Sequence, residues 1–351
     1  MKYEMEIMGI QPFNDVYYKN CMYNPLLTGI YYCKGNITPF LSNDLFTYIF
    51  DESSLSVKYV QKRLESDIIF DMGIKIDFNI DQTDYINSIK ENIISNIPIF
   101  IPIDRYYWTN ASYNQGMYKK IHMPHFFLIY GYNDNKKEFF IIDVDDNGAG
   151  CYKSSINYYE LLDCYNSFCD FIDTSNNSLF KHNLKMFRLI CIDTDNNFAN
   201  INLHLKIFKE NFFEHKNILV EDLENIRKNQ YFLSKCNFEE IFRDTKLLQP
   251  DQRDPYIREI VNPFFGIERA KIVQVYQIYT LFGERNDIFE ILKKILNNFT
   301  IEKGLLLKML LTNKDYDKTL QGILDKLDQI YELEHLYFDA LESILKKEEH
   351  D

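Results

Sequence analysis

The spacing of apolar residues changes once along the chain. Up to about Asp193, short apolar runs rich in aromatic and β-branched residues alternate with segments of helical spacing, a pattern typical of strands mixed with helices. Beyond that point apolar residues recur every three or four positions, which predicts helices. The polar segment 193–197 is turn-like. We therefore expect an α+β domain over residues 1–195 and an all-helical domain over residues 196–351.

Individual elements follow from the same spacing. Strands are predicted for four apolar runs: Ile97–Ile103, Phe126–Tyr132, Glu138–Val144 and Met186–Ile192. Helices are predicted for six segments: Ile201–Lys216, Val220–Lys235, Tyr256–Phe282, Asp287–Phe299, Ile301–Leu311 and Tyr316–Lys347. In the last helix Glu334 interrupts an apolar seam. A helix facing the core, the edge of a bundle and a homodimer contact through the C-terminal helices would each explain this seam.

A hairpin is the clearest local structure of the first half. The apolar runs Phe126–Tyr132 and Glu138–Val144 are joined by five polar residues that suit a turn. His125 stands just before the first strand, and Asp143 stands near the end of the second. Neighbouring antiparallel strands can therefore bring a histidine and a carboxylate close together.

Cys21 has the features of a nucleophile. It opens a stretch of helical spacing, and Pro25 is tolerated only in the first turn of a helix, so the helix begins near Cys21. The helix dipole stabilises a thiolate there, and the thiolate is the reactive form. His125 would act as general base, and Asp143 would orient its ring. The alternatives are a cysteine that packs as a small apolar side chain, a histidine that ends a strand and an aspartate that begins a loop.

The order and spacing of these residues resemble the papain-like superfamily. The N-terminal domain of the butirosin biosynthesis acyltransferase family is particularly similar, and the bacteriocin-processing cysteine peptidases are similar at a greater distance. The segments that carry the resemblance, across roughly residues 10–190, are Cys21–Leu27, Gly35–Phe46, Ile97–Tyr107, His125–Tyr132 and Phe140–Asp143. The resemblance implies a papain-like domain, in which the helix with the nucleophile packs on an antiparallel sheet, and a Cys21–His125–Asp143 triad.

The same resemblance implies a reaction. Members of the family take an acyl group from the phosphopantetheine thioester of an acyl or peptidyl carrier protein onto the cysteine and pass it to an amine, which gives an amide. Related protease homologues form amides in nonribosomal, closthioamide-type natural-product biosynthesis. The expected partners are thus a carrier protein and a small amine acceptor, and no cofactor is expected to be bound permanently.

Further site residues are expected around this triad. Papain-like enzymes place a glutamine before the cysteine as an oxyanion donor, where this chain has Asp15, so Gln11 or Asn14 would have to substitute. A substrate pocket is expected from four residues that follow an apolar strand: Asp104 to hold the amine, and Tyr106, Tyr107 and Trp108 to line it. Ordinary aromatic packing is the alternative for these rings.

Two other functions remain open. A cysteine peptidase or amidase of the same fold would share the triad and differ in the acceptor. A non-catalytic binding module, which would hold a peptide or carrier, belongs to another class, and the presence of all three triad residues argues against it. Metal chemistry is not expected: the calcium-like Asp143–Gly148 has Ser154 where such loops need Glu, and Pro124 separates His122 from His125.

Charge and cysteine content set the remaining expectations. The net charge of −13 disfavours nucleic acid, and an acidic carrier would need a local basic patch such as Lys119 and Lys120. The seven cysteines are irregularly spaced, so we expect reduced thiols in a cytoplasmic protein rather than a disulfide framework. No apolar run is long enough to span a membrane.

Overall fold

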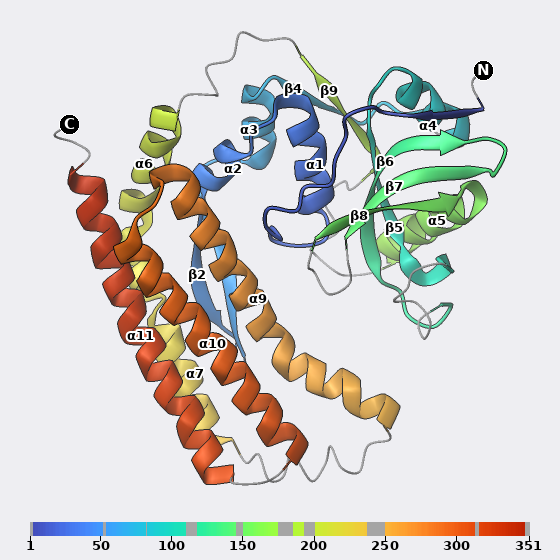
Figure 1. Ribbon diagram of the computed structural model, residues 1–351. Helices are drawn as coiled ribbons and strands as arrows, with labels where there is room; N and C mark the ends of the chain where they lie inside the picture. The colour runs from blue at the N-terminus through green and yellow to red at the C-terminus, as the bar shows by residue number, and fades with distance from the viewer. Residues whose placement is uncertain are drawn as a thin grey trace. The chain divides into compact units, whose positions relative to one another are not determined.

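The computed structural model describes residues 3–51, 54–81, 83–109, 118–144, 150–174, 185–192, 201–236, 250–312 and 316–347. The chain divides into two compact units (Figure 1). The first unit comprises residues 1–37 and 64–199, and the second comprises residues 38–63 and 200–351. The architecture is mixed, with an antiparallel sheet in the first unit and long helices toward the C-terminus.

An antiparallel sheet forms the centre of the first unit. Its hydrogen-bonded order is β4-β9-β5-β6-β7-β8, and β1 pairs with the far end of β6. The strands are β1 (Glu4–Glu6), β4 (Ile74–Asp77), β5 (Ile99–Asp104), β6 (Pro124–Asn133), β7 (Glu138–Val144), β8 (Cys151–Asn157) and β9 (Phe187–Cys191). The four predicted strands correspond to β5, β6, β7 and β9, and the predicted hairpin is the β6–β7 pair, closed at Asn133↔Glu138.

Helices pack on this sheet. They are α1 (Tyr23–Lys34), α3 (Glu65–Asp71), α4 (Tyr85–Ile94), the short 3₁₀ helix η1 (Arg105–Tyr107) and α5 (Tyr158–Thr174). Helix α1 contacts β6, β7 and β9, whereas α5 contacts β5 and β8. A bulge in β6 ends at Gly131, where a Cβ atom would lie 2.6 Å from the Phe140 ring and 2.8 Å from the Met5 carbonyl oxygen. Only glycine lets β1 and β7 approach β6 this closely.

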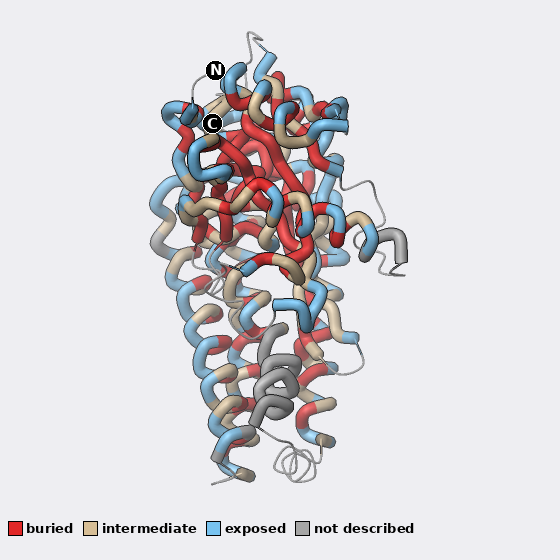
Figure 2. Tube along the Cα trace, turned by 90° about the vertical axis from the view of Figure 1, so that its right-hand side faces the viewer, coloured by how far each residue is buried: buried red, intermediate tan, exposed pale blue. Residues whose placement is uncertain are grey.

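The second unit combines a hairpin with long helices. Its elements are α2 (Thr38–Asn43), β2 (Asp44–Phe50), β3 (Leu55–Gln61), α6 (Ile201–Glu221), α7 (Glu224–Lys235), α9 (Pro250–Phe282), α10 (Asn286–Thr312) and α11 (Tyr316–Lys347). Buried positions recur along these helices at helical spacing (Figure 2). The apolar seam of α11 faces this core, and Glu334 is buried there in contact with Lys271 and Tyr48.

The structure corrects two predictions about this unit. Residues 38–63 belong with the C-terminal helices, so the unit is not all-helical. Helix side chains satisfy backbone carbonyls of that segment: Asn211 donates to the Asn43 oxygen at 2.7 Å, and Asn225 donates to the Tyr48 oxygen at 2.8 Å. The two helices predicted on either side of Thr300 are one helix, α10, in which the Thr300 hydroxyl donates to the Leu296 carbonyl one turn earlier.

Cysteine pairing differs from the expectation of reduced thiols. Cys33 near the end of α1 and Cys191 on β9 form a disulfide, which joins two segments of the first unit that are 158 residues apart. Five other cysteines are free: Cys21, Cys151, Cys164, Cys169 and Cys236. Within the described part of the chain, no helix is both long enough and apolar enough to cross a bilayer.

Candidate active site

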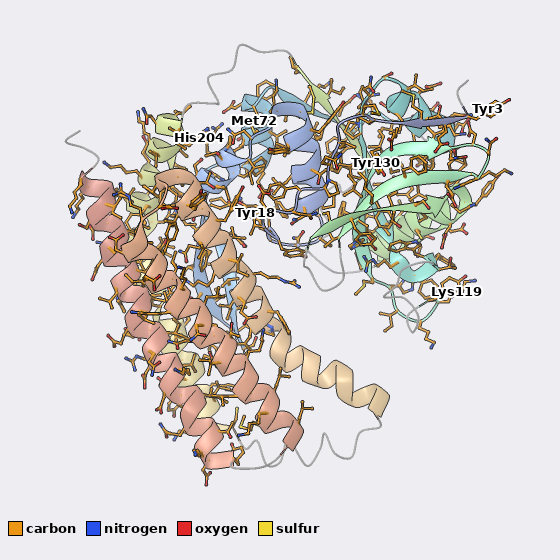
Figure 3. All side chains as sticks on the ribbon, viewed as in Figure 1. Tyr3, Tyr18, Met72, Lys119, Tyr130 and His204 are labelled. Carbon is orange, nitrogen blue, oxygen red and sulfur yellow. A yellow bond between two sulfur atoms is a disulfide. The ribbon has the colours of Figure 1, made fainter. Side chains whose placement is uncertain are left out.

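The loop that leads to Cys21 is held by the helix that follows it. Asn24, which is fully buried, accepts a hydrogen bond from the Tyr18 amide at 2.8 Å and donates to the carbonyls of Val16 at 2.8 Å and Phe13 at 3.2 Å. Thr28, one turn later, accepts from the Phe13 amide at 2.9 Å. Figure 3 labels Tyr18 on this loop. Two polar side chains on the buried side of α1 therefore fix the course of the backbone before the cysteine.

Cys21 lies two residues before α1, and Met22 is the N-cap. Pro25 is the third residue of the helix, as its tolerance for the first turn predicts. Asn20 closes a turn at this point, because its side chain accepts from the Met22 amide at 3.0 Å. The residue is partly exposed, and it stands near the positive end of the helix dipole.

His125 and Asp143 meet as the hairpin predicts. His125 Nε2 lies 2.5 Å from Asp143 Oδ1, and both residues are buried. The register explains the contact, since Leu128 pairs with Ile142 and the two strands bring His125 and Asp143 to the same end of the ladder. Cys21 is close enough to His125 for the hydrogen-bonding capacity and charge of the imidazole to lower the pKa of its thiol. Because Nε2 faces Asp143, Nδ1 is the ring nitrogen left for the thiol.

A buried arginine completes the group. Arg105, in η1 directly after β5, places Nη2 2.8 Å from His125 Nε2 and 3.4 Å from Asp143 Oδ1. Its guanidinium lies over the Trp108 ring, 5.3 Å from the centroid. The sequence reasoning did not single out Arg105 as a site residue. The sequence did contain an indication. Arg105 is a basic residue just after one predicted apolar strand, as His125 stands just before the following predicted strand.

Tyr152 is the other residue that the sequence reasoning missed. It is the cross-strand partner of Asp143 on β8, and its hydroxyl donates to Asp143 Oδ2 at 2.8 Å. The Val144 amide donates to Oδ1 at 2.7 Å. The carboxylate of Asp143 is therefore held at both oxygens, which fixes it against the imidazole of His125.

The charges of this group act on one another. Burial alone would raise the pKa of the Cys21 thiol, but the hydrogen bond and charge of His125, together with the charge of Arg105, lower it below its usual value. Burial opposes the imidazolium, yet Asp143 and Cys21 raise the pKa of His125 to about 9. Asp143 itself is buried, and the charge of His125 lowers its pKa. Both shifts favour a Cys21 thiolate beside a His125 imidazolium over the neutral thiol and imidazole.

Another buried thiol shows how much the setting matters. Cys151 on β8 also lies near Asp143, but burial raises the pKa of its thiol, and the Asp143 charge adds to that effect. Cys151 forms no hydrogen bond with an imidazole in the part of the chain that the structure describes. Proximity to the carboxylate alone therefore does not activate a thiol here.

Neither expected oxyanion donor is placed for that role. Asn14 is committed elsewhere, because its amide donates to the Cys151 carbonyl at 3.0 Å and its oxygen accepts from the Cys151 amide at 2.5 Å. This pair of bonds fastens the approach loop to β8. Gln11 is exposed, and within the described residues no hydrogen bond links it to Cys21, His125 or Asp143.

The structure buries Asp104, the residue predicted to hold the amine, among protein partners. This fully buried carboxylate accepts from His122 at 2.6 Å, from Ser167 at 2.7 Å, and from the backbone amides of Met123 at 2.8 Å and Tyr106 at 3.1 Å. All four partners are protein groups, so Asp104 caps η1 and ties it to β6 and α5 rather than facing a substrate.

The aromatic residues of the predicted pocket separate into two kinds. Trp108 is 1% exposed and packs edge-on against Phe127. Its ring is therefore part of the packing beneath the site and is not open to a substrate. Tyr106 and Tyr107 are partly exposed, and Tyr106 stacks on His122 at 4.3 Å. Lys119, labelled in Figure 3, is exposed and lies 5.7 Å from the Tyr107 ring.

The two histidines of the metal alternative face different carboxylates. His122 contacts Asp104, whereas His125 contacts Asp143. Residues 145–148 of the calcium-like sequence lie outside the described residues. Among the described residues, no group of three metal-ligating side chains occurs.

Comparison with known proteins gives no family for this chain. No protein-family model matches it, and no curated protein is detectably similar in sequence.

Proposed function

We propose that this protein is a cysteine-nucleophile acyltransferase that forms an amide, with Cys21, His125 and Asp143 as its catalytic triad. One observation carries the proposal: Cys21 and His125, more than 100 positions apart along the chain, converge so that a thiol with a lowered pKa lies beside a buried imidazole whose pKa is raised to about 9. Such perturbed pairs are typical of nucleophilic sites.

This geometry supports a reaction in two steps. The Cys21 thiolate attacks the carbonyl carbon of an acyl thioester, and a new carbon–sulfur bond forms as the bond to the donor thiol breaks. The leaving thiolate takes the proton of the His125 imidazolium. An amine then attacks the acyl-enzyme and gives its proton to His125, and the Cys21 thiolate leaves. The balance is thioester plus amine giving amide plus thiol.

The donor and the fold family belong to the same proposal. We propose a carrier-bound phosphopantetheine thioester as donor, a small-molecule amine as acceptor and a papain-like fold for the first unit. The antiparallel sheet and the nucleophile beside the N-terminus of α1 support that fold. Lys119 and Lys120 are exposed, so they are open to an acidic carrier.

A cytoplasmic location also remains a prediction. The Cys33–Cys191 disulfide runs against it, because disulfides persist mainly in oxidising compartments.

Hydrolysis is the second candidate outcome. A peptidase or amidase would use the same three residues and pass the acyl group to water, and the triad geometry fits it equally. The choice depends on whether water is excluded from the acyl-enzyme.

Intact-protein mass spectrometry tests the proposal. Wild type is incubated with short acyl thioesters, and we expect a mass gain that is lost in Cys21→Ala and discharged by added amine as amide. Cys236→Ala is the matched control, since Cys236 is also partly exposed but burial raises the pKa of its thiol. Discharge by water alone would favour the hydrolase, and labelling that persists in Cys21→Ala would contradict the nucleophile and favour a binding module.

A further inference from the structure

Arg105 is a buried cation inside the triad. Its side chain is 4% exposed, and its ion pair with Asp143 is longer than the His125–Asp143 contact: 3.4 Å against 2.5 Å. Nη2 lies closer to the His125 ring, at 2.8 Å from Nε2. A buried guanidinium this close to an imidazole repels the imidazolium form. Such an arrangement is unfavourable for stability, so a role of the charge in the chemistry of the site would explain it.

The surrounding structure holds Arg105 in this place. Its backbone amide donates to the Met123 carbonyl at 3.0 Å, two residues before His125, and Asp104 caps the same short helix. The guanidinium lies over the Trp108 ring. Three separate contacts thus fix the cation between His125 and Asp143.

We propose that Arg105 is a positioning residue of this site, whose guanidinium sets the pH range in which Cys21 and His125 exist as a thiolate–imidazolium pair. This inference rests on the proposed function of Cys21 as a nucleophile. The cation stabilises the thiolate and opposes the imidazolium, so it moves the whole range to lower pH. Asp143 acts in the opposite direction on both groups.

The charge balance of the site supports this role. The Arg105 charge lowers the pKa of Cys21 and lowers the pKa of His125, whereas the Asp143 charge raises both. Four titratable groups near the pair come from three places: Arg105 after β5, Asp143 on β7, and Tyr152 and Cys151 on β8. Tyr152 donates to Asp143, and the thiol of Cys151 has a raised pKa, so Arg105 is the cation that opposes Asp143.

The test compares wild type with Arg105→Met, which keeps an apolar stem over Trp108 and removes the charge. The rate of Cys21 alkylation by iodoacetamide, followed by peptide mapping from pH 4 to 10, reports the thiolate. The imidazole titration of His125, followed by NMR, reports the imidazolium. We expect both transitions to move to higher pH, and alkylation below the wild-type thiolate transition to slow on the order of tenfold.

A purely structural role predicts a different result. If Arg105 only held the site together, its loss would return both groups toward their ordinary values, so the thiol transition would rise and the imidazole transition would fall. That opposite movement, or no movement, would overturn the inference. Arg105→Lys keeps the charge and should leave both transitions near wild type. Where the neutral variant does not unfold cooperatively, an Arg105→Lys variant whose thiol transition rises while its imidazole transition falls would equally overturn it.

The two proposals fail separately. The wild-type alkylation profile alone tests whether Cys21 is an activated nucleophile. The difference between wild type and the Arg105 variants tests the role of the guanidinium, and the acyl-transfer assay enters neither measurement.

Discussion

Oδ1 of Asp143 lies 2.5 Å from Nε2 of His125, so the carboxylate acts on both the orientation and the charge of the ring. This contact makes Asp143→Asn an informative variant. The amide preserves the shape but lacks the charge, and acyl transfer near neutral pH should fall by about 10²-fold or more.

The pH dependence of Asp143→Asn has a defined sign. The Asp143 charge raises the pKa of Cys21 and of His125. Its removal should therefore let the thiolate form at lower pH and let the imidazolium lose its proton at lower pH. Both limbs of the pH–rate profile should therefore move to lower pH. Asp163→Asn, an exposed carboxylate on α5, is the control and should leave the profile in place. A profile unchanged in Asp143→Asn would contradict the assigned contact.

The buried amide of Asn24 gives a second prediction. Asn24→Ala removes three hydrogen bonds to the loop before Cys21 and leaves their backbone partners unsatisfied. We expect a loss of about 2–4 kcal/mol in the free energy of unfolding, together with slower alkylation of Cys21. Chemical denaturation measures the first and peptide mapping the second.

A matched surface change separates this effect from a general one. Asn87→Ala on α4 removes an exposed asparagine and should alter the free energy of unfolding by no more than about 0.5 kcal/mol. If Asn24→Ala behaved like Asn87→Ala, the loop would not depend on Asn24.

Local pattern was enough to predict the hairpin and a helix start near Cys21, because both depend on short-range features. The turn residues close β6 onto β7, and Pro25 restricts where α1 can begin. The His125–Asp143 contact follows from that hairpin register. These are the parts of the candidate site that nearby residues determine.

Contacts between residues far apart along the chain could not be predicted from the sequence in the same way. Residues 38–63 read as part of the first half, but they pack with α6, α7 and α9 through side chains more than 150 positions away. Arg105 lies beside His125 because β5, which ends just before Arg105, pairs with β6. Glu334 interrupted an apolar seam for a reason on another helix, its ion pair with Lys271 of α9. Spacing along one segment carries no information about such partners.

Glu302 provides a prediction about pH and stability. This α10 carboxyl is fully buried, and neither of its oxygens has a hydrogen-bond partner among the described residues. Burial raises its pKa well above the usual value, and Tyr48 is the titratable neighbour that its charge affects. A group with a raised folded-state pKa contributes stability at low pH that is lost as the pH rises toward that pKa.

The variant Glu302→Gln removes this dependence. We expect the free energy of unfolding of the second unit to rise by about 1–3 kcal/mol at pH 8. Its decrease between pH 5 and pH 8 should be smaller than in wild type. Circular dichroism at 222 nm during urea unfolding measures both. Glu290→Gln, on an exposed part of the same helix, should change stability by no more than about 0.5 kcal/mol. A Glu302→Gln variant less stable than wild type at pH 8 would mean that the carboxylate has a partner.

The Cys33–Cys191 disulfide gives the last prediction. It closes a long loop within the first unit and joins the end of α1 to β9. Alkylation of the denatured, unreduced protein should modify five cysteines, and reduction beforehand should raise this number to seven. Cys33→Ser should lower the free energy of unfolding of the first unit by about 2–5 kcal/mol, because the bridge restricts the unfolded chain. Cys236→Ser, which removes a free thiol, is the control. Seven modified cysteines without reduction would show that the bridge is open and would restore the original expectation of reduced thiols.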